Sequence, residues 1–173
     1  MKVFFGHLGH DTNNSAELEG LIQGLIMVTN EGWLPATLEG DSKFIIQMAK
    51  KLACGQVPGK VSFSWHLWLR LEVLQSLLSR TSAVSFIHVH RDANKVADLL
   101  ANQGIESGSM LLVGSLDEFR QARWLDRCQD LALTDLHLAE PMVDGDVGPQ
   151  EHGRLHEDQT QRTSSWRGVS IHD

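Results

Sequence analysis

Several features that define common protein classes are scarce in this 173-residue sequence. Only two cysteines occur, Cys54 and Cys128, and their wide separation predicts neither a disulfide framework nor a C-x-x-C zinc site. The apolar runs are too short for a membrane-spanning helix, and the first residues lack the apolar stretch of a secretory signal peptide. Internal repeats are absent. We therefore expect a soluble intracellular protein from a reducing compartment, with no membrane partner.

Lysine is missing from the C-terminal part of the chain. Residues 105–173 hold 6 arginines against 13 acidic residues, a net charge of −7, whereas residues 1–104 hold 9 basic and 9 acidic residues and are neutral. An acidic chain argues against general polyanion binding. The neutral first part leaves a local nucleic-acid groove open as a hypothesis without supporting it.

The pattern of apolar residues predicts alternating strands and helices. Strands are expected at 2–8, 36–40 and 84–89, and helices at 14–31, 42–53, 64–80 and 91–104. The order β-α-β-α-α-β-α predicts an α/β domain over residues 1–104, with a partly parallel sheet covered by helices. Residues 105–139 are predicted to form a partly helical extension, in which 109–114 is a small strand or a packing loop. Residues 140–173 have the composition of a disordered tail.

Residues at the ends of the predicted helices suggest how these helices begin and end. Asn13 or Asn14 is expected to cap the first helix, and Ser42 the second. Gly32 and Gly104 are expected to follow or end helices, because glycine readily adopts the left-handed conformation found there.

Three acidic residues occupy positions that suggest a site. Glu17 lies near the start of the first helix, Asp41 follows strand 36–40, and Asp98 lies next to the apolar stripe of the last helix. Carboxylates at these places can converge at the sheet edge where open α/β sheets bind ligands. Such a cluster suits Mg²⁺, and two ions can activate a water and stabilise a leaving oxygen. Acids are also common in the first turn of any helix, so position alone leaves both explanations open.

Three stretches, TNNSAELEGLIQGL, LEGDSKFII and HVHRDANKVADLLANQG, together resemble the ribonuclease H type 1 fold. They resemble most closely the plant ribonuclease H-like domains of retroelement reverse transcriptases. In that family a T-N-N-x-x-E helix, a strand ending in D-S, and a histidine strand followed by R-x-x-N-x-x-A-D occur in this order. The resemblance covers about residues 3–104 and implies a mixed sheet flanked by helices.

The resemblance also implies roles for individual residues and a substrate, the RNA–DNA hybrid. Glu17, Asp41 and Asp98 correspond to three of four carboxylates that bind two Mg²⁺ ions, and His88 to a mobile histidine that helps product leave. The residues matching those that contact nucleic acid, including the 2′-hydroxyls that distinguish RNA, are Thr12, Asn13, Asn14 and Asn94. His88 equally fits an ordinary strand histidine, and Asn13 and Asn14 equally fit helix caps.

The sequence departs from the family pattern at its start. In the family an Asp-Gly pair on the first strand supplies the fourth carboxylate, and a second strand precedes the run matched by residues 2–8; neither is found here. We therefore expect a fold that lacks the first two strands, with cleavage weakened because losing one charge-stabilising group costs about 10²–10³ in rate. We also expect residues 2–8 to move into the vacated position and pair directly with 36–40.

Three functions follow as alternatives. The first is a metal-dependent endonuclease that hydrolyses the RNA strand of RNA–DNA hybrids. The second is a truncated, catalytically silent retroelement remnant that acts at most as a weak binding module. The third is an α/β interaction module unrelated to nucleic acid, whose stability would not depend on Mg²⁺.

Overall fold

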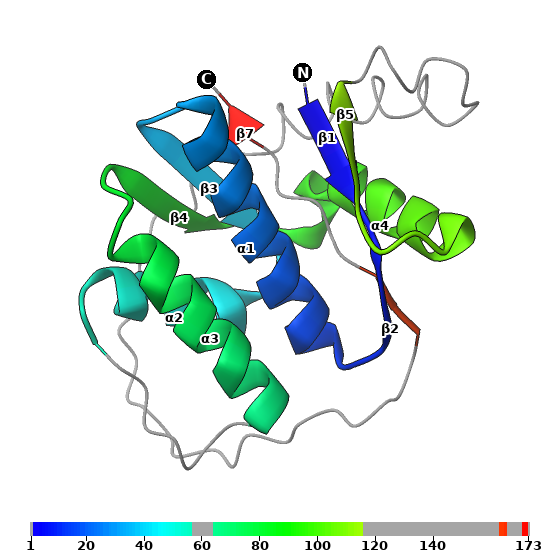
Figure 1. Ribbon diagram of the computed structural model, residues 1–173, viewed down its shortest axis with the longest axis horizontal. Helices are drawn as coiled ribbons and strands as arrows, with labels where there is room; N and C mark the ends of the chain where they lie inside the picture. The colour runs from blue at the N-terminus through cyan, green and yellow to red at the C-terminus, as the bar shows by residue number, and fades with distance from the viewer. Residues whose placement is uncertain (1, 57–63, 116–162, 166–170, 173) are drawn as a thin grey trace.

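Strands and helices alternate along the computed structural model, which describes residues 2–56, 64–115, 163–165 and 171–172 (Figure 1). The elements are β1 (Lys2–Phe5), β2 (His7–His10), α1 (Asn13–Glu31), β3 (Ala36–Gly40), α2 (Lys43–Ala53), α3 (Trp65–Leu78), β4 (Val84–His88), the 3₁₀ turn η2 (Arg91–Ala93), α4 (Lys95–Ser107), β5 (Leu112–Ser115), β6 (Thr163–Ser165) and β7 (Ile171–His172). This order confirms the predicted α/β class. The single strand expected at 2–8 is instead two strands, β1 and β2, and the elements from α1 to α4 follow in the predicted order apart from the added 3₁₀ turn.

The strands form three small sheets. β3 pairs in parallel with β4, from Ala36 opposite Val84 to Gly40 opposite His88, and its other edge pairs antiparallel with β7. β1 pairs antiparallel with β5, and β2 antiparallel with β6. In Figure 1, α1 crosses between the β4–β3–β7 sheet and the β1–β5 pair. The parallel β3–β4 pair agrees with the predicted partly parallel sheet.

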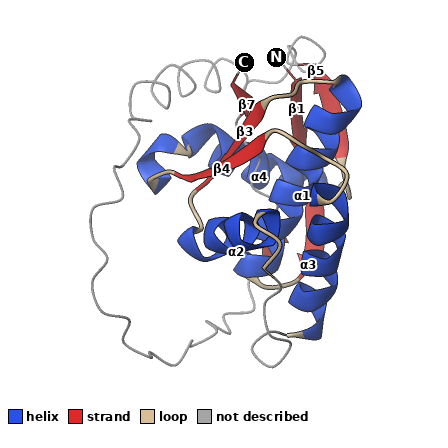
Figure 2. Ribbon diagram, turned by 90° about the vertical axis from the view of Figure 1, so that its left-hand side faces the viewer, coloured by secondary structure: helices blue, strands red, loops and turns tan. Residues whose placement is uncertain are grey.

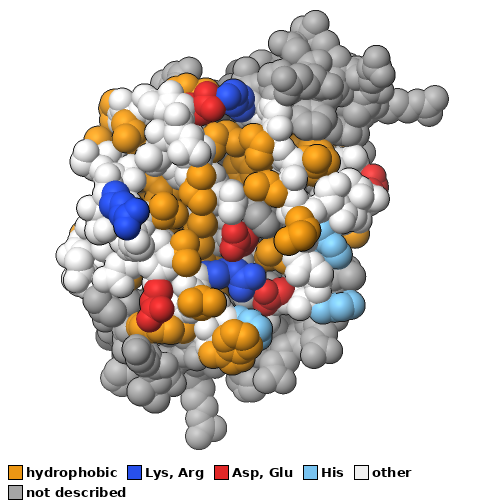
Figure 3. Space-filling model, viewed as in Figure 1, with side chains coloured by type: hydrophobic (Ala, Val, Ile, Leu, Met, Phe, Trp, Pro, Cys, Tyr) orange, Lys and Arg blue, Asp and Glu red, His pale blue; other side chains and the backbone are white. Residues whose placement is uncertain are grey.

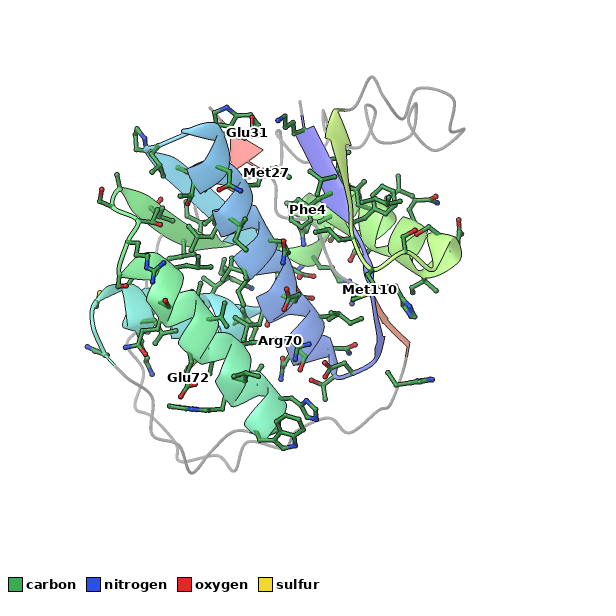
Figure 4. The ribbon with its side chains drawn as sticks, in the orientation of Figure 1. Phe4, Met27, Glu31, Arg70, Glu72 and Met110 are labelled. Atoms are coloured by element: carbon green, nitrogen blue, oxygen red, sulfur yellow. The ribbon has the colours of Figure 1, made fainter. Side chains whose placement is uncertain are left out.

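The expectation that residues 2–8 pair directly with 36–40 is wrong. β1 takes β5 as its partner, in a register that runs from Lys2 opposite Ser115 to Phe5 opposite Leu112. Val3 and Phe5 contact Leu100 of α4, while Phe4 contacts Met27 of α1 on the opposite face (Figure 4). Because β1 is buried on both faces and has a strand partner, nothing drives it toward β3.

The largest apolar cluster lies beneath α1 and joins it to β3, α2 and α3. Figure 2 shows α3 alongside α1, and residues of the two helices contact each other. The fully buried leucines of this cluster are Leu18, Leu25, Leu38 and Leu74. These positions match the helical and strand periodicities of the sequence, so the core was predictable from the pattern alone.

Helix α3 is apolar on more than one face. Leu67, Leu71 and Leu74 are buried, whereas Trp65 and Leu69, one turn apart, are 70 % and 56 % exposed. The exposed side chains of α3 are therefore surface groups of a helix whose other face packs into the core.

No helix among the described residues combines the length and the apolar content needed to cross a membrane.

The ends of α1 and α2 follow local sequence, with one correction. The N-cap of α1 is Thr12, whose Oγ1 accepts the Ser15 N–H at 3.2 Å, so Asn13 and Asn14 are the first helical residues. Threonine suits this position because the cap residue has an extended backbone, from which its hydroxyl can accept the N–H of the residue three positions further along the chain. Gly32 ends α1 with φ of 71°, and Ser42 caps α2, as predicted.

Helix α4 begins and ends later than predicted. Arg91–Ala93 form a separate 3₁₀ turn, and the α-helix runs from Lys95 through Gly104 to Ser107. The terminating glycine is Gly108, which has φ of 63°. Gly104 lies within the helix, and this helical position is a glycine because the backbone of Gly6 packs so closely against it that no side chain fits.

The C-terminal part contributes short strands to the described structure. β5 confirms that the apolar run at 109–114 contains a strand. Five residues of the predicted tail lie in β6 and β7, paired with β2 and β3. The predicted helix after Ser115 and the other residues of the tail lie outside the described residues.

Gly32→Ala is expected to lower the free energy of unfolding by about 1 kcal/mol, the cost of a left-handed backbone in an L-residue. Nothing lies within 4 Å of the position of the added Cβ, so the substitution tests backbone conformation alone. Urea unfolding followed by circular dichroism measures the change. Gly32→Asn is the control and should cost less, because asparagine tolerates this conformation; an alanine variant as stable as the parent would contradict the assigned helix end.

Candidate functional site

Two predicted site residues meet at the carboxyl ends of the parallel strands. Gly40, the last residue of β3, lies opposite His88 of β4, and Asp41 follows directly. His88 Nε2 lies 3.2 Å from the carbonyl oxygen of Asp41. A carbonyl only accepts hydrogen bonds, so in this arrangement Nε2 carries the ring proton. The Val89 N–H, donating to the Gly40 carbonyl at 3.0 Å, continues the strand pairing beside this contact.

Asp41 lies between a strand and a helix. It is half-buried, and its Oδ1 atom is buried. Ser42 caps α2 directly after it, so the carboxylate stands next to the positive end of that helix dipole. This is the position that the sequence predicted for it.

Glu17 and Asp98, the other two predicted carboxylates, lie on two different helices. Glu17 lies in the second turn of α1 and is half-buried. Asp98 lies in the first turn of α4, where its backbone N–H donates to the carbonyl of Asn94 at 3.1 Å. Its Oδ2 lies 3.5 Å from Nε of Arg91, a side chain that is 65 % exposed. Asp98 therefore already has a cation beside it.

The described residues do not form a ready metal-ligand group. Among residues 2–56, 64–115 and the two short C-terminal strands, no three His, Cys, Asp or Glu side chains are grouped closely enough to hold one ion. The guanidinium of Arg91 beside Asp98 also disfavours a second cation at that carboxylate. In this arrangement the three predicted carboxylates do not form a joint ligand group, and the magnesium site implied by the resemblance stays a prediction.

Thr12 and the two asparagines form the turn that enters α1. The Thr12 hydroxyl accepts the Ser15 N–H and donates to Ser15 Oγ at 3.0 Å, so it holds the helix start in place. Asn13 is exposed and Asn14 half-buried. Their side-chain amides both donate and accept hydrogen bonds, which suits contacts with sugar and phosphate oxygens.

Asn94 and His88 differ from simple surface residues. Asn94 is 4 % exposed and stands between η2 and α4, so the structure places it inside the domain rather than on its surface. His88 is half-buried, whereas His90, two residues further along, is exposed. The two histidines therefore have different environments although they are expected on the same side of a strand.

Sequence reasoning missed Arg70 of α3, which lies beside the start of α1 (Figure 4). Its Nη2 lies 3.0 Å from Asp11 Oδ2 and its Nε 3.1 Å from Glu19 Oε2. Figure 3, in the same view, shows a basic side chain between acidic ones on this face of the molecule. A lone arginine in an apolar helix was the only available signal, because its partners lie 51 and 59 positions away in the sequence.

Comparison with protein families identifies the chain. Residues 3–104 match the model of the reverse transcriptase-like family. Searches of curated proteins and of solved structures found no match. The plant type and the lack of the first two strands stay predictions. The matched range is more than half of the chain and contains Glu17, Asp41, His88 and Asp98, so this α/β domain has a ribonuclease H-like fold and the chain belongs to the reverse transcriptase-like family.

Proposed function

We propose that this domain binds RNA–DNA hybrids at the edge where β3 and β4 end and α1 begins, and that it does not cut them at a substantial rate. One observation carries the proposal: Asp41 and His88 are side by side at the carboxyl ends of two parallel strands. This is where open α/β sheets bind ligands. The family match supports a nucleic acid as that ligand.

The turn that begins α1 supplies groups suited to the two strands of a hybrid. The first backbone N–H groups of a helix have no partner within the helix and favour phosphate oxygens. The exposed side chain of Asn13 stands among them. An amide can accept from and donate to the 2′-hydroxyl, which is the group that distinguishes RNA from DNA.

A second candidate is Mg²⁺-dependent hydrolysis of the RNA strand. The order of the family motifs supports it, as does the buried Oδ1 of Asp41 at a strand end. Glu17, Asp41 and Asp98 would hold the metal, and His88 would help product leave. This requires the three carboxylates to come closer together than they are in the described arrangement, and Arg91 to leave Asp98.

A hybrid-binding assay separates the two candidates. With a fluorescently labelled hybrid and EDTA present, the chain is expected to bind the hybrid several-fold more tightly than a DNA duplex of the same sequence. Asp41→Asn and Asp98→Asn should bind at least as tightly as the parent, because each removes a negative charge near phosphates. Glu106→Gln, at the other end of α4, is the charge-matched control and should have no effect.

The same samples with Mg²⁺ are then resolved on a denaturing gel. Intact RNA supports the binding function. Cleavage that is lost in Glu17→Gln, Asp41→Asn and Asp98→Asn, but kept in Glu106→Gln, would establish the second candidate. Equal affinity for hybrid and DNA duplex, without cleavage, would contradict both.

A further inference from the structure

We infer that Arg70 is a positioning residue: it holds the turn from Asp11 to Asn14 in the shape that binds the hybrid. The inference deepens the proposed function and rests on it. The guanidinium lies between two carboxylates, 3.0 Å from Asp11 and 3.1 Å from Glu19. Asp11 precedes the helix cap of α1 and Glu19 lies one to two turns into that helix, so a single side chain of α3 clamps both ends of the segment that carries the turn.

The clamp reaches the turn through Asp11. Asp11 Oδ2 accepts from Arg70, while Oδ1 of the same carboxylate accepts the Thr12 N–H at 2.8 Å. Moving Asp11 would therefore move the backbone of the cap residue. On the other side, Glu19 Oε1 accepts from Gln23 Nε2 at 2.9 Å, which fixes the second carboxylate along α1.

Burial makes these contacts stronger than ordinary surface ion pairs. The side chains of Arg70, Asp11 and Glu19 are only 20 %, 15 % and 17 % exposed. Charge-assisted hydrogen bonds that are partly shielded from water hold their geometry better than exposed pairs. The rigid guanidinium can serve two carboxylates at once, which a lysine ammonium cannot do with the same geometry.

The charges exclude the simplest alternative, in which Arg70 itself binds phosphate. One positive charge lies between two negative ones, so the cluster carries a net charge of −1. Its field does not attract an anion, and its donors are directed at carboxylates. The contribution of Arg70 to binding must then pass through the turn that it holds.

The first test compares Arg70→Met with Arg80→Met, which removes the same charge just beyond the other end of α3, where the side chain is exposed. Arg70→Met is expected to weaken hybrid binding about tenfold, the change in affinity that corresponds to the loss of one charge-assisted hydrogen bond. It is also expected to reduce the preference for hybrid over DNA duplex. Arg80→Met should change both by less than about twofold. General loss of stability would lower the active fraction but not this preference.

The second test asks whether one substitution weakens or strengthens hybrid binding. Asp11→Asn frees the positive charge of Arg70 but breaks the clamp. If Arg70 positions the turn, Asp11→Asn weakens hybrid binding, and the double variant with Arg70→Met is no weaker than Arg70→Met alone. If Arg70 contacts phosphate directly, Asp11→Asn strengthens binding in the parent but not in Arg70→Met, and the inference is overturned. Arg70→Lys should behave as a partial loss, since it keeps the charge but not the bridge.

Hydrogen exchange of the Thr12 amide separates the inference from the proposed function. Exchange should be at least several-fold faster in Arg70→Met than in the parent, and unchanged in Arg80→Met. Unchanged exchange in Arg70→Met overturns the clamp whether or not the chain binds hybrids. Faster exchange in a chain that binds no hybrid keeps the clamp, and overturns both the proposed function and the positioning role for hybrid binding.

Discussion

Gly104→Ala is expected to destabilise the domain by about 3 kcal/mol or more, at the upper end of the usual cost of overpacking. A Cβ at this position would meet the carbonyl oxygen of Gly6, with the carbonyl carbon at 2.8 Å and the nitrogen at 3.0 Å. These are backbone atoms of a buried segment, so they cannot rotate away as the end of a flexible side chain could. Alanine gains about 1 kcal/mol of helix propensity over glycine, which is too little to compensate.

Gly108→Ala, at the C-cap of the same helix, is the matched control. It has φ of 63° and nothing within 4 Å of an added Cβ, so its cost should be near 1 kcal/mol, from the left-handed backbone alone. Urea unfolding of both variants measures the difference. If Gly104→Ala were as stable as Gly108→Ala, α4 would not pack against Gly6 as the structure describes.

The same glycine illustrates what sequence can and cannot predict. Gly104 closes an apolar stripe and therefore looked like the end of a helix, yet the helix continues to Ser107. The reason for a glycine there is the close approach of Gly6, a residue 98 positions earlier. Local propensity describes what a glycine permits, while the contact that requires it is tertiary.

The partner of each strand could likewise not be predicted from the pattern of apolar residues alone. The order of elements and the parallel pairing of β3 with β4 follow from periodicity and from the crossover that α/β chains favour. The pairing of β1 with β5 depends on where α4 places Leu112 relative to Phe5, which no local signal encodes. An apolar run at 109–114 showed that a strand was available but not which edge it would join.

Within the candidate site, the sequence predicted on which helix or strand end each residue lies better than it predicted which residues lie close together. Asp41 and His88 lie side by side because both positions are fixed by the ends of adjacent parallel strands. Asp98 lies on α4, one turn of helix after a 3₁₀ segment that the pattern did not distinguish from the helix, and Arg91 of that segment is its neighbour. The position of a helix relative to a sheet edge depends on such details of its first turn.

Thr12→Val is expected to lower the free energy of unfolding by about 2–5 kcal/mol. Valine has nearly the same shape but loses the cap to the Ser15 N–H, which costs about 1–2 kcal/mol. It also removes the partner of Ser15 Oγ, on a residue that is 0 % exposed, and an unsatisfied buried hydroxyl costs about 1–3 kcal/mol. Thr12→Ser keeps both hydrogen bonds and should change stability by less than about 1 kcal/mol. Urea unfolding measures both; equal effects would show that the hydroxyl does not cap α1.

Thr12→Asn and Thr12→Asp then separate the cap from the contact with nucleic acid. Asparagine and aspartate cap helices about equally well, so both variants should unfold near the parent midpoint. They differ by one negative charge at the place where the proposed function puts a phosphate. Thr12→Asp is therefore expected to bind the hybrid at least about tenfold more weakly than Thr12→Asn, in the same assay with EDTA, and the gap should narrow as salt is raised. Equal binding by these two variants would show that the hybrid does not bind at the start of α1, even if Thr12→Val unfolds as predicted.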